Sequence, residues 1–217
     1  MKLMKLFQLI PIKNIRKQHW ERVYNKNKPD ELGWYQEYPE MSLKLIAATG
    51  VGVDGNIIDV GGGTSKLAGI LLDKGYMRLT VLDISGSSIE RAKVNLGEKS
   101  KQIVWIEADV TKFNFTECFD IWHDRAVFHF LTDANDRRRY VDSLNQGLIP
   151  GGHLIISTFG LKGPPKCSGL NVVRYSAETL QKEFGDNFVM IEAFDETHDT
   201  PSKVQQNFVY CRFNKRI

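Results

Sequence analysis

The feature that most constrains the fold is the stretch IIDVGGGTS at positions 57–65. Ile57 to Val60 have the composition of a buried β-strand end, and three glycines follow at once. Glycines at this point allow a sharp turn and a close approach of the backbone to a ligand, which a Cβ would obstruct. Apolar residues then recur at helical spacing, and Thr64 or Ser65 is expected to cap that helix. A strand, a glycine turn and a helix predict the beginning of a βαβ unit.

The spacing of these glycines indicates which ligand the turn would hold. A dinucleotide fingerprint has the form G-x-G-x-x-G/A, in which the last small residue lets the helix pack closely on the strand. Gly61 and Gly63 fit this pattern, but Lys66 occupies the third position. Lys66 therefore argues against a nicotinamide-dependent oxidoreductase, the alternative class of enzyme. A ligand with one nucleoside and no pyrophosphate is the better match.

Three acidic residues, each at the end of its own predicted strand, extend this argument. Asp59 ends the first strand, where a carboxylate can accept hydrogen bonds from an ammonium group. Asp83 ends the next strand, LTVLD, where an acid can hold ribose hydroxyls. Asp109 ends the third strand region, IVWIEAD, where it can accept from the exocyclic amine of adenine. Amine, ribose and adenine in that order describe S-adenosylmethionine.

Four motifs in order, DVGGGTS, VLDIS, EADV and LIPGGHLIIST, resemble those of class I, seven-strand S-adenosylmethionine-dependent methyltransferases. The resemblance covers roughly residues 18–213 and departs at Ser65, where many members have a glycine. It implies an α/β fold with a doubly wound, mostly parallel seven-stranded sheet and a C-terminal antiparallel β-hairpin. It also implies S-adenosyl-L-methionine as cofactor, S-adenosyl-L-homocysteine as product, and no metal.

The residues that would bind the cofactor are two N-terminal aromatics and the residues at the strand ends. They are Trp20, Tyr24, Asp59, Gly61, Gly62, Gly63, Asp83, Ile84, Asp109, Val110 and His123. The pattern H-W-x-x-x-Y followed by G-W-Y, within residues 18–38, resembles N-terminal segments of seven-strand lysine methyltransferases and of some small-molecule relatives. Trp20 and Tyr24 are four residues apart and share a helix face, either as a lid over the methyl donor or as packing for a lead-in helix.

His123 and Asp124 end the fourth strand beside the predicted switch point of the sheet, and they are the candidate catalytic residues. The segment WHDRAVFHFL resembles the D-[KR]-[AG] segment of lysine methyltransferases and of thiol-methylating relatives. It does not match [DN]-P-P-[YFW], which argues against a DNA adenine methyltransferase. The structural alternatives are a core histidine bonded to the backbone and, for Asp124, a helix cap or an ion pair with Arg125.

The favoured acceptor is a protein lysine amine, because the N-terminal aromatics and the D-R-A segment resemble those of lysine methyltransferases. A lysine must lose a proton at pH 7, at a cost of roughly 4.6 kcal/mol, and Asp124 is the acid expected beside its ammonium. The alternatives are a small-molecule thiol, metalloid or amine as acceptor, and a catalytically silent S-adenosylmethionine-binding protein. The acidic run Asp195 to Asp199 is expected to form a loop between the last two strands.

Charge and cysteine usage narrow the partners and the compartment. The net charge is +3, but five basic residues lie within positions 1–20 and three within 212–217, so the chain between them is net negative. A nucleic-acid groove would place the basic excess on the folded body, so nucleic acid is not an expected partner and the basic ends are read as solvated. Three dispersed cysteines without metal-ligand spacing favour a reducing compartment, and no apolar run is long enough to span a membrane.

Residues 1–38 are expected to be a basic, aromatic lead-in or lid, and residues 39–217 the cofactor-binding domain. The cytoplasm is the expected location, and a mitochondrial presequence is the alternative reading of the acid-free start.

Overall fold

A computed structural model describes residues 15–217, so most of the basic start and its presequence reading lie outside the described residues. The helices are α1 (Ile15–Lys26), α2 (Glu40–Ala48), α3 (Leu67–Asp73), α4 (Gly86–Leu96), α5 (Ala134–Gly147) and α6 (Ala177–Phe184). Short 3₁₀ turns lie at η1 (Pro29–Glu31), η2 (Gly97–Gln102) and η3 (Phe128–Phe130). The strands are β1 (Asn56–Val60), β2 (Arg78–Asp83), β3 (Ile103–Glu107), β4 (Phe119–Arg125), β5 (Leu148–Phe159), β6 (Lys166–Cys167), β7 (Leu170–Asn171), β8 (Phe188–Asp199) and β9 (Gln205–Lys215).

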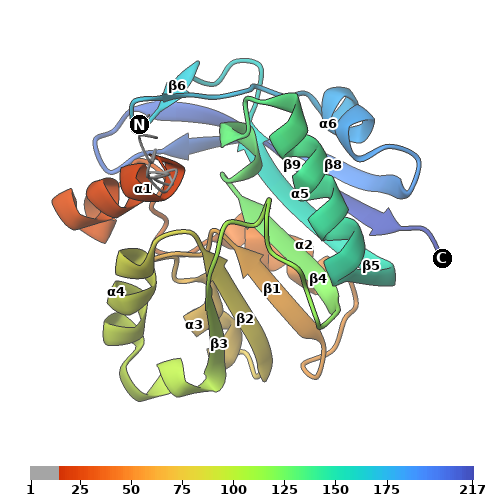
Figure 1. Cartoon of the computed structure of the whole chain (residues 1–217), viewed down its shortest axis with the longest axis horizontal. Coiled ribbons are helices and arrows are strands. Elements are labelled where there is room, and N and C mark those ends of the chain that lie inside the picture. Colours follow the sequence, from red (N-terminus) through yellow and green to blue (C-terminus); the bar gives the residue numbers. More distant parts are fainter. Residues whose placement is uncertain (1–14) are drawn as a thin grey trace, which may run out of the picture.

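Seven strands form one sheet in the order β3-β2-β1-β4-β5-β9-β8, as Figure 1 shows. The strands β1 to β5 are parallel to one another, whereas β9 runs antiparallel to both β5 and β8. This arrangement confirms the predicted doubly wound sheet with its C-terminal hairpin. The strand order reverses between β1 and β4, and a crevice for ligands opens at such a point outside the carboxyl ends of the strands.

Helices cover both faces of this sheet, as expected for parallel strands that are apolar on both sides. Strand residues alternate between the faces, so Ile58 and Trp122 pack with Tyr140 of α5 on one side. Their neighbours Ile57 and Ile121 pack with α2 and α3 on the other side. Figure 1 shows α5 in front of the sheet and α2 and α3 behind it. Adjacent residues of one strand therefore pack against the helices on opposite faces of the sheet.

Two local predictions were wrong. The helix after the glycine turn begins only at Leu67, with Lys66 at its N-cap and no side-chain cap, although Ser65 Oγ accepts a hydrogen bond from the Leu67 amide at 3.1 Å. The acidic run is not a loop, because Asp195 to Asp199 continue β8 and pair with β9. Exposed residues alternate with less exposed ones along this edge strand. Its many polar side chains therefore make the segment look like a loop in the sequence.

Candidate functional site

Two adjoining cavities lie at the carboxyl ends of the parallel strands. The main cavity reaches the ends of β1, β2 and β4, and the side cavity lies over the glycine turn. They share three lining residues, Trp34, Gly61 and Arg125, and therefore adjoin each other. Ligands of open α/β sheets bind in a crevice at this place in the fold.

Most of the predicted site residues line this pair of cavities. The main cavity is lined by Trp20, Tyr24, Gly61, Asp83, Ile84, Asp109 and Val110. Asp59, Gly62 and His123 join Gly61 around the side cavity. Gly63 and Asp124 are in neither lining. The chain thus brings together the three strand-end carboxylates that the sequence singled out.

The glycine turn is packed too tightly for side chains. Gly61 has a φ of +69°, and a Cβ there would lie 2.0 Å from Val127 Cγ2. Gly63 has a φ of +42°, and a Cβ there would meet Tyr24 Oη at 2.7 Å and Asp83 Oδ2 at 2.8 Å. Positive φ values and close neighbours both require glycine, so the turn brings its bare backbone to the floor of the site.

Asp59 and His123 form a buried pair across β1 and β4, whose register places them side by side. His123 Nδ1 lies 2.7 Å from Asp59 Oδ1, and His123 Nε2 lies 2.9 Å from Ser42 Oγ on α2. Both ring nitrogens are thus engaged, so His123 orients Asp59 and has no free nitrogen for the acceptor. The second oxygen, Asp59 Oδ2, is buried beneath Gly62 and has no hydrogen-bond partner among residues 15–217.

Asp83 is a buried carboxyl group whose ionisation depends on its surroundings. Its Oδ1 accepts a hydrogen bond from the Ser85 amide at 2.8 Å. Burial raises the pKa of Asp83 to about 7, against the lowering effect of its hydrogen bonds to Ser85 and Ser88. The carboxyl group therefore changes charge near neutral pH when no ligand is bound.

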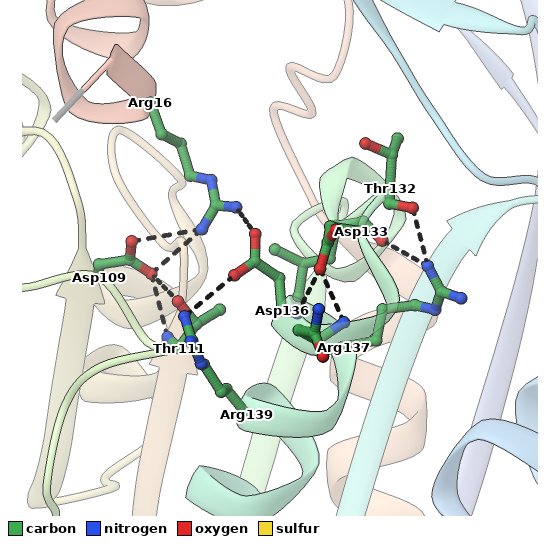
Figure 2. A network of polar contacts seen from close by, with 10 residues as sticks. Arg16, Asp109, Thr111, Thr132, Asp133, Asp136, Arg137 and Arg139 are labelled. Atoms are coloured by element: carbon green, nitrogen blue, oxygen red, sulfur yellow. Dashed lines mark hydrogen bonds and ion pairs between the residues drawn. The ribbon is translucent and has the colours of Figure 1, made fainter.

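Asp109 belongs to a polar network that fastens α1 across the main cavity, as Figure 2 shows. Thr111 donates to Asp109 Oδ1 through its amide at 3.0 Å and its hydroxyl at 2.7 Å. Arg16 donates to the two Asp109 oxygens at 3.2 and 3.4 Å and also pairs with Asp136 of α5. Arg16 and Lys17 are therefore not merely solvated, because Arg16 bridges Asp109 and Asp136 and Lys17 pairs with Glu107.

Further contacts hold α1 in place. Glu21 accepts hydrogen bonds from the Gly86 and Ser87 amides, at 2.8 and 3.3 Å, at the start of α4. These are the free amides of a helix N-terminus, which favour a carboxylate. The Trp20 ring lies 4.8 Å from Phe130 and 5.8 Å from Trp34, measured between ring centroids. Trp20 and Tyr24 therefore line the main cavity from α1.

Sequence reasoning missed several residues of the site. They are Arg16, Arg125, Ala126, Val127, Phe130 and Leu131 in the main cavity, and Gln36 and Ser42 in the side cavity. Arg125 was considered only as an ion-pair partner of Asp124, yet it donates to the Trp34 carbonyl at 2.6 Å and to Tyr210 Oη at 2.8 Å. The apolar run after β4, AVFHFL, was the available signal, because such a run at a switch point lines the crevice.

Asp124 does not take the predicted place beside the acceptor. It is fully buried on the α5 side of the sheet, where Oδ1 accepts from the Val127 amide at 2.9 Å and Oδ2 accepts from Tyr140 Oη at 2.6 Å. Tyr140 in turn accepts from Trp122 Nε1 at 2.9 Å. Burial raises the pKa of Asp124 to about 6. Both oxygens are engaged, so Asp124 positions the turn that follows β4.

Replacing Asp124 by Asn should lower the free energy of unfolding by about 1–3 kcal/mol, because the amide nitrogen cannot accept the Tyr140 hydrogen bond. The melting temperature measures this loss. Asp142→Asn, the same chemical change on the exposed side of α5, is the control and should shift stability by about 0.5 kcal/mol or less. An unchanged melting temperature for Asp124→Asn would contradict the buried hydrogen bonds of Asp124. It would then favour the predicted role of Asp124 as the acid beside the acceptor.

Comparisons with known proteins agree with this geometry. The family described as a methyltransferase domain matches residues 58–156. Nodulation protein S of Rhizobium fredii is 35% identical over 138 residues, which cover 64% of this chain and 74% of that protein. Nodulation protein S of Rhizobium tropici is 30% identical over 126 residues, 58% of this chain and 51% of that protein. The chain thus spans about half of that relative's length.

More distant relatives have other names. Malonyl-[acyl-carrier protein] O-methyltransferase 2 of Ilyobacter polytropus is 24% identical over 188 residues, which cover 83% of this chain and 69% of that protein. The eEF1A lysine and N-terminal methyltransferase of Danio rerio is 24% identical over 144 residues, 64% of this chain but only 21% of that protein.

Solved structures share the fold. The structure described as N-methyltransferase NodS from Bradyrhizobium japonicum WM9 with S-adenosyl-L-homocysteine has a TM-score of 0.65 at 22% identity, covering 92% of this chain and 97% of that one. A structure from work on echinomycin biosynthesis has a TM-score of 0.75 at 19% identity, covering 92% of this chain and 91% of that one. With the glycine turn, the three carboxylates and the seven-strand sheet, these findings show that the chain belongs to the class I S-adenosylmethionine-dependent methyltransferases.

Proposed function

We propose that this protein transfers the methyl group of S-adenosylmethionine to a nucleophile on a small-molecule acceptor, with an amine as the favoured nucleophile. The observation that carries the proposal is the buried, unpartnered Oδ2 of Asp59, a residue that lines the side cavity next to the cavity lined by Asp83 and Asp109. An unpaired buried acceptor is costly, and a ligand ammonium group would satisfy it. The nodulation S relatives, one of them described as an N-methyltransferase, support an amine.

The residues present fit the methyl donor. Asp59 Oδ2 would accept from its ammonium group, and Asp83 would accept from its ribose hydroxyls. The adenine would lie in the main cavity between apolar side chains, among them Ile84 and Val110, with Asp109 on the wall.

Methyl transfer requires the protein to position the acceptor and to exclude water from the site. The bound donor supplies an already activated methyl group. The chain must align a nucleophile with that group and exclude water. Helix α1 covers the main cavity and is held there by Arg16 and Glu21. The cover is completed by the rings of Trp20, Trp34 and Phe130.

The comparisons give less support to a protein lysine than to a small-molecule amine, because the relative named for lysine methylation is matched over only 21% of its length. An acceptor amine of either kind must lose its proton before it can react. Asp124 lines neither cavity, and Arg125 disfavours a protonated amine beside it, so the acceptor amine is expected to bind in its neutral form. The distant eEF1A methyltransferase keeps protein lysine as a second candidate.

Transfer of a radiolabelled methyl group from S-adenosylmethionine into cell lysate, separated into protein and small-molecule fractions, tests this proposal. We expect label in the small-molecule fraction with the wild type and not with Asp83→Ala. Label in protein alone would favour the lysine candidate. Calorimetry with S-adenosylhomocysteine and NAD is the companion measurement, and binding of NAD alone would contradict the proposal.

The affinity for S-adenosylhomocysteine should depend on pH through Asp83. Its pKa in the free protein is raised to about 7, and ribose hydroxyls bind the ionised carboxylate better, so affinity should rise with pH through this value. Affinity at pH 8 should exceed that at pH 6 by about tenfold, since one pH unit below the pKa costs about 1.4 kcal/mol. Calorimetry at the two pH values measures this ratio.

Asp83→Asn is the control for this pH dependence, because an amide does not titrate in this range. We expect it to bind weakly at both pH values. The raised pKa has the opposite effect on the free protein, since the contribution of Asp83 to stability is lost as pH rises through about 7. Equal wild-type affinities at pH 6 and pH 8 would show that ribose does not engage this carboxylate.

A further inference from the structure

Arg125 carries a positive charge and lines both cavities. Its Nε donates to Tyr210 Oη at 2.8 Å, and its Nη1 donates to the Trp34 carbonyl at 2.6 Å. The remaining nitrogen, Nη2, is buried and has no hydrogen-bond partner among residues 15–217. No carboxylate of this described part of the chain forms an ion pair with it.

The guanidinium group is held rigidly in this position. It lies 5.1 Å from the centre of the Phe208 ring, and both Phe208 and Tyr210 are fully buried on β9. A fixed guanidinium with one free N–H edge is pre-organised for a carboxylate or a phosphate oxygen. Burying an unpaired charge is unfavourable, so a ligand anion is the expected compensation.

The surroundings of Arg125 do not neutralise its charge. His129 Nδ1 accepts from the Phe159 amide at 3.1 Å, and burial together with the Arg125 charge lowers the pKa of His129 to about 3, so His129 is neutral. The pKa of His198 is also lowered, first by burial and then by Arg125. Glu196 of β8 acts on Tyr210, and Asp59 lines the side cavity with Arg125, but among residues 15–217 neither acid forms an ion pair with Arg125.

The position of Arg125 in the sheet separates it from the parts that would hold the donor. The carboxylates for the donor lie at the ends of β1, β2 and β3. Arg125 ends β4, and its fixing partners Tyr210 and Phe208 lie on β9, beyond β5 in the strand order. Arg125 therefore lies across β1 from Asp83 and Asp109, on the side of the site that remains for the acceptor.

We propose that Arg125 recognises a carboxylate or similar oxyanion on the methyl acceptor, so that the acceptor is an acidic small molecule. The rings of Trp20, Trp34 and Phe130, which line the same cavity, would hold its apolar part. The proposal rests on the proposed function, because it describes the second substrate of the same site. It adds a residue that selects the acceptor by charge.

Two matched pairs of probes test this role: benzoate with benzamide, and phenylacetate with phenylacetamide. Each is titrated into protein saturated with S-adenosylhomocysteine, with tryptophan fluorescence and ligand-observed NMR as readouts. We expect the wild type to bind at least one acid about tenfold more tightly than its amide. Arg125→Gln should reduce this preference to twofold or less while it changes the affinity for S-adenosylhomocysteine by less than threefold.

Two further variants make the outcome interpretable. Arg125→Lys keeps the charge but loses the planar fork, so it should keep part of the preference, and it serves if Arg125→Gln does not fold. Arg138→Gln removes an exposed arginine of α5 and should leave the preference unchanged. Absence of S-adenosylhomocysteine binding by the wild type would contradict the proposed function itself.

Equal binding of acid and amide by the loaded wild type would overturn only the role of Arg125. A tenfold or greater loss of S-adenosylhomocysteine affinity in Arg125→Gln would also overturn it, because Arg125 would then hold the donor's own carboxylate.

Discussion

Replacement of Asp83 by Ala is expected to weaken the binding of S-adenosylhomocysteine at pH 8 by at least about a hundredfold. The ionised carboxylate would accept two ribose hydrogen bonds, and hydrogen bonds to a charged group contribute about 1.5–3 kcal/mol each. Two such bonds correspond to about 3–6 kcal/mol, which is a factor of a hundred or more. Calorimetry measures the loss, and the melting temperature of the free variant establishes that it is folded.

Asp73→Ala is the matched control for this prediction. It removes an exposed carboxylate at the end of α3 that pairs with Lys99 on the outer surface. Surface ion pairs contribute little, so its affinity for S-adenosylhomocysteine should equal that of the wild type. A folded Asp83→Ala protein with an affinity within threefold of the wild type would show that this carboxylate does not bind the donor.

Replacement of Gly61 by Ala should damage both the fold and the site. The new Cβ would lie 2.0 Å from Val127 Cγ2, and the φ of +69° is unfavourable for alanine. Overpacking costs about 1–3 kcal/mol and the left-handed conformation about 1–2 kcal/mol, so we expect a loss of about 2–5 kcal/mol in the free energy of unfolding. Movement of the turn should also weaken S-adenosylhomocysteine binding by at least about tenfold.

Gly50→Ala separates these two contributions. Gly50 has a similar φ of +74°, but an added Cβ would meet nothing within 4 Å. It should therefore lose only the conformational part, about 1–2 kcal/mol, and keep its affinity for the donor. Denaturant unfolding measures the loss in the free energy of unfolding for both variants. The difference between the two losses is the cost of the clash with Val127. Equal losses for the two variants would contradict the close packing of the turn.

Much of the fold was predictable because the signals are local. The apolar strand, the glycine turn and the acid after each strand fix a parallel sheet whose strands end at one edge. Asp59, Asp83 and Asp109 accordingly line the two cavities. The length of β8 was not predictable from its polar composition, because an edge strand with an exposed face looks like a loop in a single sequence.

The reacting side of the site was less predictable, for a geometric reason. His123 and Asp124 are adjacent in β4, so their side chains point to opposite faces of the sheet. His123 joins Asp59 and Ser42 on one face, whereas Asp124 joins Tyr140 on the other. The pattern shows that the strand ends there but not which of the two reaches the cavity. Arg16 posed a similar problem, since its partners Asp109 and Asp136 are distant in the sequence.

Among residues 15–217, no helix is long and apolar enough to cross a membrane. In the same part of the chain, no group of three histidine, cysteine or acidic side chains is placed to hold a metal ion.

A crystal structure of the complex with S-adenosylhomocysteine tests the central claim most directly. We expect the ligand ammonium within hydrogen-bond distance of Asp59 Oδ2, the ribose hydroxyls at the Asp83 carboxylate and the adenine in the main cavity beside Val110. A nucleoside bound outside the cavities that share Gly61, or one whose ribose does not touch Asp83, would contradict it.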